Sequence, residues 1–259
     1  MCFDLDSAPP IAPLAGGAYD GRRLILTAAD GTHLRAFEAR AGDLPSRAAM
    51  LILPDVRGLF TFYEELALRF AEAGIDALAV DYFGRTAGAG DRGPDFDHQP
   101  HIAQVHWSGL RADIEAGAHQ LLAAAGPAEG GRDLYAVGFC FGGRLAYLCA
   151  SLEDPAFAGV IGFYGPPVGP SRGEVPAPID LAGSFRGRVL GLFGGADAAI
   201  PPESRSAFET ALGAGGVDHE LVTYPDAPHS FFDRKQADYQ AESDDAWGRI
   251  LAFVHPAAG

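Results

Sequence analysis

A cysteine flanked by glycines is the feature of this sequence with the clearest chemistry. Cys140 lies in the run G-F-C-F-G-G at 138–143, between an apolar segment typical of a buried strand and a segment with helical spacing. A nucleophile on such a tight turn needs small residues two positions before and after it, and Gly138 and Gly142 meet that need. The start of a helix also favours the thiolate, and the N–H of Phe141 would face a developing oxyanion. The pattern predicts a cysteine nucleophile; the alternative is a core cysteine beside a glycine-rich turn.

Candidates for an acid and a base follow at the ends of two later strands. The apolar run at 188–193 predicts a strand, and Asp197 follows it after two glycines. The run at 219–224 predicts another strand, and His229 lies in the loop after it. Taken singly, they could be a turn former and a surface histidine. Together with Cys140 they occur in the order nucleophile, acid, base, each after a strand, which predicts a catalytic triad.

Strand and helix patterns alternate along the rest of the chain. Helices are predicted from Thr61 to about Ala73, where a capping box begins the helix and Gly74 ends it, and from about residue 105 to 125. This alternation predicts an α/β fold with a mostly parallel central sheet and helices on both faces, in one domain over residues 1–259. The predicted central strands are 50–53, 75–80, 134–137, 158–164, 188–193 and 219–224.

The remaining segments are expected to be an arm, a hairpin and two loops. Residues 1–21 are rich in Pro, Ala and Gly and predict an extended arm. The segments 22–28 and 32–39 flank Asp-Gly and predict a hairpin of edge strands. The loops at 84–106 and 165–187 are long enough to form the rim and lid of a pocket.

Composition indicates a compact intracellular enzyme. The net charge of −15 argues against nucleic acid and anionic membranes as partners. Three cysteines, Cys2, Cys140 and Cys149, suggest no disulfide framework and a reducing compartment. The acidic N-terminus does not resemble a secretory signal, and no apolar run approaches the ~20 residues of a membrane span. We therefore expect a cytoplasmic protein.

Several basic and metal-ligating residues are candidate binding groups. A small anionic substrate would need local arginines, and the candidates are Arg57, Arg85, Arg144 and Arg234, each of which could instead be paired on the surface. Arg85 is favoured because it follows a strand at the edge where ligands gather. The His and Asp residues of the loop at 95–106 match no standard metal spacing, and the glycines at 138–143 match no nucleotide motif. We expect no metal and no other cofactor.

These segments together resemble the dienelactone hydrolases, the cysteine-nucleophile branch of the α/β-hydrolase fold. The resemblance extends from about Arg22 to about Val254. It implies Cys140 as nucleophile, Asp197 as acid and His229 as base. The matching segments are 53–59, 81–85, 138–143, 194–197 and 229–232.

The resemblance also implies roles for residues around the triad. It places the oxyanion hole at the backbone N–H groups of Val56 and Phe141. In the best-known members a glutamate that holds the free thiol inactive occupies the position of Asp55. Alternatively, Asp55 has only a structural role, as a turn residue after Pro54. One arginine that binds the substrate carboxylate matches Arg85. The family's second such arginine falls at Asp233 here, so the sequence departs from the pattern at this position.

The expected activity is acyl transfer from a small ester or lactone to water through a thioester on the cysteine. A thiolate leaves more readily than an amine, so esters and lactones are favoured over amides. Two alternatives remain open at this point: a non-catalytic binding protein on a hydrolase scaffold, and a hydrolase of non-ester bonds or a thiol-dependent acyl transferase. The expected partner is a small-molecule substrate, and the expected assembly is a monomer or small homo-oligomer.

Overall fold

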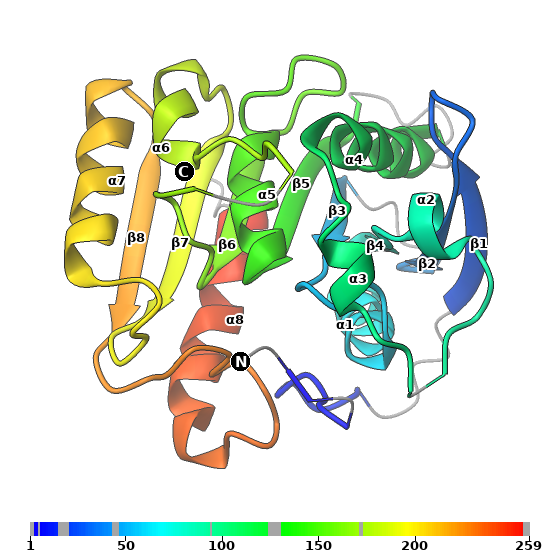
Figure 1. Ribbon diagram of the computed structural model, residues 1–259. Coiled ribbons are helices and arrows are strands. Elements are labelled where there is room, and N and C mark those ends of the chain that lie inside the picture. The colour runs from blue at the N-terminus through cyan, green and yellow to red at the C-terminus, as the bar shows by residue number, and fades with distance from the viewer. Residues whose placement is uncertain are drawn as a thin grey trace.

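One mixed sheet organises the part of the chain that the computed structural model describes, which is residues 3–4, 6–14, 21–42, 47–93, 95–123, 131–170 and 173–255. The first three strands in spatial order pair antiparallel and the others pair parallel (Figure 1). The predicted α/β class with a mostly parallel sheet is confirmed. The spatial order is β1 (Gly21–Thr27), β2 (His33–Ala39), β4 (Asp76–Val80), β3 (Ala48–Leu53), β5 (Asp133–Phe139), β6 (Gly159–Phe163), β7 (Arg188–Gly194) and β8 (His219–Tyr224).

Helices cover the sheet on both faces. In Figure 1, α4 and α5 lie in front of the sheet and the upper part of α8 lies behind it. The ring of Phe70 in α1 packs 5.0 Å from that of Trp247 in α8, so these two helices pack together. Among the described residues no helix is long and apolar enough to cross a membrane. The helices are α1 (Thr61–Glu72), α2 (Gly84–Ala87), α3 (Gln99–Ile102), α4 (Trp107–Ala123), α5 (Phe141–Cys149), α6 (Pro178–Leu181), α7 (Pro202–Ala214) and α8 (Gln240–Val254), with short 3₁₀ turns at Ala182–Ser184 and Ala237–Tyr239.

The central strands form where their side chains are buried on both faces. Every residue of β3, β4 and β6 is buried, which explains why their sequences are continuous apolar runs rather than alternating patterns. Leu51 of β3 pairs with Leu78 of β4 on one side and Ala136 of β5 on the other. This parallel register brings the carboxyl ends of the strands to one edge of the sheet.

Several local predictions were wrong in detail. The hairpin is present, but of its two strands only β1 lies at an edge of the sheet, because β2 also pairs with β4. Helix α1 begins at Thr61 without a side-chain cap, since Phe60 occupies the N-cap position. The two predicted loops contain the short helices α2, α3 and α6. Within the N-terminal arm, the described residues Phe3, Ser7, Pro9 and Pro10 are buried rather than free of the core; Cys2 and residues 15–20 lie outside the described residues.

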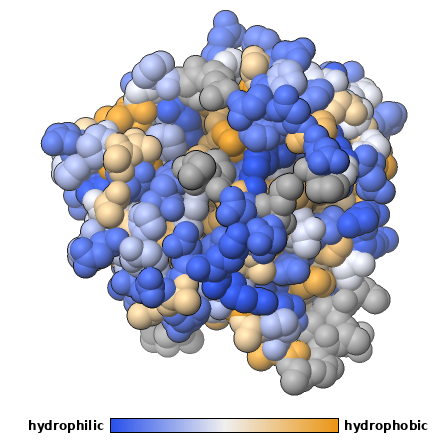
Figure 2. Space-filling model, turned by 60° about the horizontal axis from the view of Figure 1, so that its bottom comes forward, coloured by the Kyte–Doolittle hydropathy of each residue, from blue (hydrophilic) through white to orange (hydrophobic). Residues whose placement is uncertain are grey.

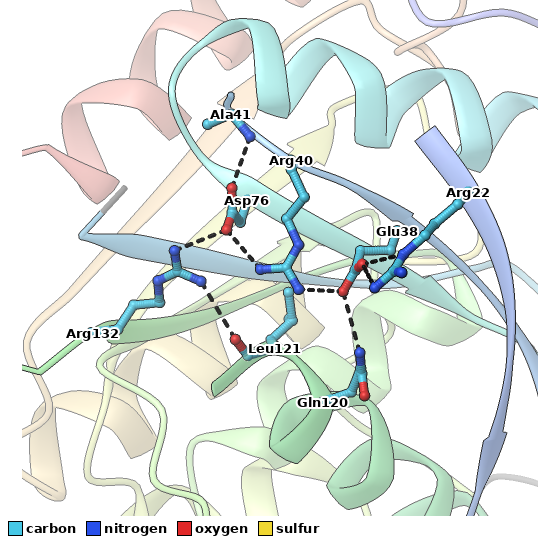
Figure 3. A network of polar contacts seen from close by, with 8 residues as sticks. All are labelled: Arg22, Glu38, Arg40, Ala41, Asp76, Gln120, Leu121 and Arg132. Atoms are coloured by element: carbon cyan, nitrogen blue, oxygen red, sulfur yellow. Dashed lines mark hydrogen bonds and ion pairs between the residues drawn. The ribbon is translucent and has the colours of Figure 1, made fainter. Parts of the chain in front are cut away.

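A network of charged side chains around the buried Glu38 and Asp76 joins the strands at the edge opposite the carboxyl ends (Figure 3). Glu38, at the end of β2, is fully buried and accepts hydrogen bonds from Arg22 in β1 and from Arg40. The Arg40 guanidinium also donates to Asp76, at the start of β4, over 2.9 Å. Arg132, just before β5, pairs with Asp76 over 2.8 Å. The network therefore connects four strands through alternating charges.

Glu38→Gln is expected to lower the free energy of unfolding at pH 7 by roughly 3 kcal/mol, because Arg22 and Arg40 lose their buried carboxylate. Burial raises the pKa of Glu38, but the hydrogen bonds from Arg40 and Arg22 outweigh burial and hold this pKa below its ordinary value. The carboxylate therefore contributes stability above the pKa of an unfolded glutamate, about 4.3, and loses that contribution as the pH falls through the folded-state pKa.

Urea denaturation at pH 7 and at pH 3 measures both parts of this expectation. The difference between the wild type and Glu38→Gln should be largest at pH 7 and smaller at pH 3. Glu209→Gln, at an exposed position on α7, is the matched control and should change stability by less than about 0.5 kcal/mol. A Glu38→Gln difference that stays constant across this pH range would contradict the role of the carboxylate charge.

Candidate active site

Cys140 occupies the tight turn between β5 and α5. Its backbone has φ 54° and ψ −114°, in a region that residues other than glycine rarely adopt. The backbone N–H of Cys140 donates to the Phe163 carbonyl of the neighbouring strand over 3.0 Å, which fixes the turn to the sheet. Its side chain is partly exposed and lines a cavity. The strained backbone thus presents the thiol at the carboxyl edge of the sheet.

Two glycines allow this turn to close. A Cβ atom on Gly138 would lie 1.9 Å from the carbonyl oxygen of Gly142. A Cβ atom on Gly142 would lie 2.0 Å from the carbonyl oxygen of Leu53 and 2.3 Å from that of Pro54. These are contacts with backbone atoms, which cannot rotate away as a side chain could. The requirement for small residues on both sides of Cys140, expected from the sequence, therefore has a direct steric cause.

Asp197 and His229 meet beside Cys140. Asp197 follows β7 and His229 follows β8, and the imidazole Nδ1 lies 2.7 Å from the carboxylate Oδ2 of Asp197. The other carboxylate oxygen accepts the Ala199 N–H over 2.9 Å, which orients the carboxylate. Burial raises the pKa of Asp197, but the hydrogen bond and charge of His229 outweigh burial, and this pKa lies below its ordinary value. Asp197 is thus an ionised partner for the imidazole.

The three side chains share one cavity of about 460 Å³, lined by Cys140, Asp197, His229, Pro166 and residues 196–200. The strands β7 and β8 end at the lower edge of the sheet in Figure 1. Figure 2, turned so that this edge comes forward, shows mostly hydrophilic residues with smaller hydrophobic patches between them. The cavity of Cys140 lies at the carboxyl edge of the sheet, which is where parallel α/β sheets bind ligands.

Arg144, a candidate substrate ligand, instead holds the loop after β6. It is only 2% exposed, and its guanidinium donates to backbone carbonyls between Pro166 and Pro176. Burial lowers the pKa of Arg144. This loop contributes Pro166 to the cavity, so Arg144 shapes the cavity wall from below the surface. Arg234, another candidate, is exposed, and its backbone N–H donates to Ala8.

The groups expected to bind an oxyanion lie on two adjacent turns. Phe141 is the first residue of α5, so its N–H has no partner within the helix. Val56 follows the end of β3, the strand that pairs with β5. The side chain of Asp55 is fully buried and accepts hydrogen bonds from the Arg57 backbone N–H over 2.8 Å and from the Arg57 guanidinium over 3.0 Å. Arg57 therefore neutralises Asp55 directly beside the proposed oxyanion hole.

Arg85 lies in a different cavity from Cys140. Its guanidinium pairs with Asp30 over 2.7 Å and with Asp113 over 2.5 Å, and the three residues line a cavity of about 660 Å³. Burial raises the pKa of Asp113 to about 7, although the hydrogen bond from Arg85 acts in the opposite direction. Asp113 was not predicted. Its spacing was a usable signal, because it shares the buried stripe of α4 with Leu110, Ile114 and Gly117.

An aromatic cluster packs beneath the edge of the sheet that carries Cys140. The ring of Phe3, from the N-terminal arm, lies 4.0 Å from that of Phe62 and 5.9 Å from that of Phe139, the residue before Cys140. Tyr164 packs 6.2 Å from Phe3 and 4.8 Å from the imidazole of His229. The arm thus supports the turn at Cys140 and the imidazole of His229, a role that its Pro-rich and Gly-rich composition did not indicate.

One histidine of the loop at 95–106 packs against an aromatic ring. His101 stacks on Phe96 with ring centroids 4.9 Å apart. Asp233, at the position of the second family arginine, is buried and accepts the Lys235 N–H over 3.1 Å. Within the described ranges, no group of three His, Cys, Asp or Glu side chains is arranged to hold a metal ion.

The two described thiols are expected to react differently with iodoacetamide. Cys140 is partly exposed in the cavity, whereas Cys149 is fully buried and burial raises the pKa of its thiol. Iodoacetamide should therefore alkylate Cys140, inactivate the protein and spare Cys149. Peptide mapping by mass spectrometry follows each cysteine separately, Cys2 included. Equal labelling of Cys140 and Cys149, or full activity after Cys140 is alkylated, would argue against this assignment.

Comparisons with known proteins all point to one family. Residues 35–258 match the dienelactone hydrolase family. A protein of Salmonella typhimurium given the name carboxymethylenebutenolidase is 30% identical over 261 residues, which covers 95% of this chain and 93% of the relative. A protein of the same name from Methylorubrum extorquens is 31% identical over 221 residues and covers 83% and 73% of the two chains. A crystal structure from Klebsiella pneumoniae described as a dienelactone hydrolase has a TM-score of 0.73 and 28% identity, and covers 93% of this chain and 100% of its own.

Proposed function

Because this chain belongs to the dienelactone hydrolase family, we propose that it hydrolyses small carboxylic esters or lactones, with Cys140 as the nucleophile. The observation that carries this proposal is the placement of Cys140 on a strained turn, in one cavity with a histidine that is bonded to an aspartate. The name of the curated relatives, carboxymethylenebutenolidase, favours a lactone with an acidic side group as a substrate class.

The reaction begins with proton transfer from Cys140 to Nε2 of His229. Asp197 holds the imidazole through Nδ1 and stabilises the imidazolium that forms. The thiolate attacks the carbonyl carbon of the ester, and the carbonyl oxygen gains negative charge. The N–H groups of Val56 and Phe141 bind that oxyanion, and each such donor typically lowers the barrier by about 3 kcal/mol.

The second half of the reaction regenerates the thiol. The imidazolium of His229 gives its proton to the leaving alcohol, and a thioester on Cys140 remains. His229 then removes a proton from water, which attacks the thioester and releases the acid. The cavity of about 460 Å³ is suited to a small acyl group.

A substrate screen tests this proposal. Aryl esters, small lactones and a dienelactone are offered to the wild type and to Cys140→Ala, and product acids are measured with and without an added alcohol as acyl acceptor. The proposal predicts hydrolysis by the wild type alone, with water as the main acceptor. Transfer mainly to the alcohol would favour an acyltransferase, and no turnover of any ester or lactone would contradict the proposal.

Arg85 lines a different cavity from Cys140, so we propose that it binds the carboxylate of an anionic substrate only when the substrate extends into both cavities, and matched substrates test this role. Arg85→Ala should raise KM for an anionic ester by the equivalent of roughly 1.5–3 kcal/mol. The KM for the methyl ester of the same substrate should stay nearly unchanged. Because Asp30 already pairs with this guanidinium, a substrate carboxylate must displace it, so Asp30→Ala should lower KM for the anionic ester. Equal losses on both esters in Arg85→Ala would make Arg85 a structural residue.

A further inference from the structure

A second group of basic side chains lines a cavity that the proposed reaction does not use. Arg23, Arg35, Arg57 and Arg92 surround this cavity of about 420 Å³, which we call the arginine cavity. It shares no lining residue with the cavity of Cys140. Four of the 19 Lys and Arg residues of a chain with net charge −15 thus gather at one place. Four guanidinium groups at one place offer many N–H donors, which is the chemistry that binds an anion.

Three of these arginines have close carboxylate partners. These pairs are Arg23 with Glu64 over 2.9 Å, Arg57 with Asp55 over 3.0 Å and Arg92 with Asp81 over 2.5 Å. Their charges are largely compensated within the protein. They contribute N–H donors and rigid walls more than net charge.

Arg35 differs from the other three arginines. It lies in β2 and is only 9% exposed, yet its ion pair with Asp91 spans 3.8 Å, and the Asp91 side chain is 80% exposed. Its buried Nη1 has no hydrogen-bond partner among the described residues. A buried guanidinium with so weak a partner costs free energy, and an anion in the arginine cavity would offset that cost.

Apolar groups complete the arginine cavity. Leu59, Phe60 and Phe96 also line it, and the guanidiniums of Arg57 and Arg92 lie over the rings of Phe60 and Phe96 at 4.2 and 4.8 Å. A small adjoining cavity shares Arg23 and Arg35 and extends to Ile25. Ile25 is one of the few large apolar side chains that is exposed, at 56%, among the described residues. A ligand that fits both parts carries an apolar body as well as a charge.

We propose that the arginine cavity binds a small organic oxyanion, a carboxylate or phosphate group on an apolar or aromatic body, whose charge pairs with Arg35. The charged group would accept hydrogen bonds from Arg35, and the apolar body would lie along Phe60 and toward Ile25. The proposed binding site shares no lining residue with the catalytic cavity, and Arg57 connects it to Asp55 beside the proposed oxyanion hole.

Calorimetry on Cys140→Ala tests the proposal without any contribution from turnover. The probes are phenyl phosphate, benzoate, inorganic phosphate and the neutral benzamide. Phenyl phosphate or benzoate should bind more tightly than inorganic phosphate, and benzamide should not bind. The preference between phenyl phosphate and benzoate identifies the anionic group. In the Cys140→Ala background, Arg35→Met should weaken binding about 10-fold or more, as the loss of a charge-assisted hydrogen bond predicts.

Arg111→Met is the matched control, since Arg111 pairs with Glu115 on the exposed surface of α4, outside the arginine cavity. This variant should leave the affinity unchanged. If Arg35→Met does not fold, Arg35→Lys, which keeps the charge but loses the planar fork, should still weaken binding. The proposal is overturned if no anion binds at millimolar concentration, if benzamide binds as tightly as benzoate, or if replacement of Arg35 leaves the affinity unchanged.

Discussion

Cys140→Ala is expected to lower kcat for an activated aryl ester by about 10⁴-fold or more, because loss of a triad nucleophile leaves only binding and the oxyanion hole. Steady-state kinetics with a neutral aryl ester measures this loss. The fold should be unaffected, since the substitution removes only one partly exposed sulfur atom.

Cys149→Ala is the matched control for this prediction. Cys149 lies at the end of the same helix and is fully buried, so its replacement should alter stability but leave kcat near the wild-type value. Comparable losses of activity in the two variants would show that the effect of Cys140→Ala is structural rather than chemical.

The second large effect is expected from Gly142→Ala. Its Cβ would lie 2.0 Å from the Leu53 carbonyl oxygen and 2.3 Å from that of Pro54, so β3 and α5 would have to separate. We expect a loss of more than about 4 kcal/mol in the free energy of unfolding, together with loss of activity, because the same turn carries Cys140. Urea denaturation followed by circular dichroism measures the first quantity.

Gly248→Ala provides the comparison for a glycine without this constraint. Gly248 is exposed on α8, and a Cβ there would meet no atom within 4 Å. Alanine at that helix position should raise stability by up to about 1 kcal/mol. If Gly142→Ala were as stable as the wild type, that result would contradict the claim that the turn packs too closely against β3 for a Cβ atom.

Local patterns were sufficient to predict the architecture. The strands β3 to β7 are apolar runs bounded by polar or glycine-rich turns, so their positions could be predicted before their neighbours were known. Cys140, Asp197 and His229 could be located for the same reason, because each follows such a run. Parallel pairing then brings the ends of these strands to one edge, and the side chains to one cavity.

Contacts between distant segments could not be predicted in this way. The pairing of Arg85 with Asp113 joins residues 28 positions apart, and nothing near Arg85 in the sequence indicates it. The interior position of β2 depends on its pairing with β4, and the five carbonyls around Arg144 depend on the path of a loop. The burial of Phe3 likewise depends on where the N-terminal arm packs.

The central claim is that the acyl group passes through Cys140, and the most direct measurement is to trap it there. Wild type is mixed with excess aryl acetate, quenched in acid during the first turnovers and mapped by mass spectrometry. The account predicts one acetyl group on the peptide that contains Cys140, removable by hydroxylamine as a thioester is, and none on Cys140→Ala. An acetyl group on a different residue, or an initial burst of released phenol with Cys140 unmodified, would contradict it.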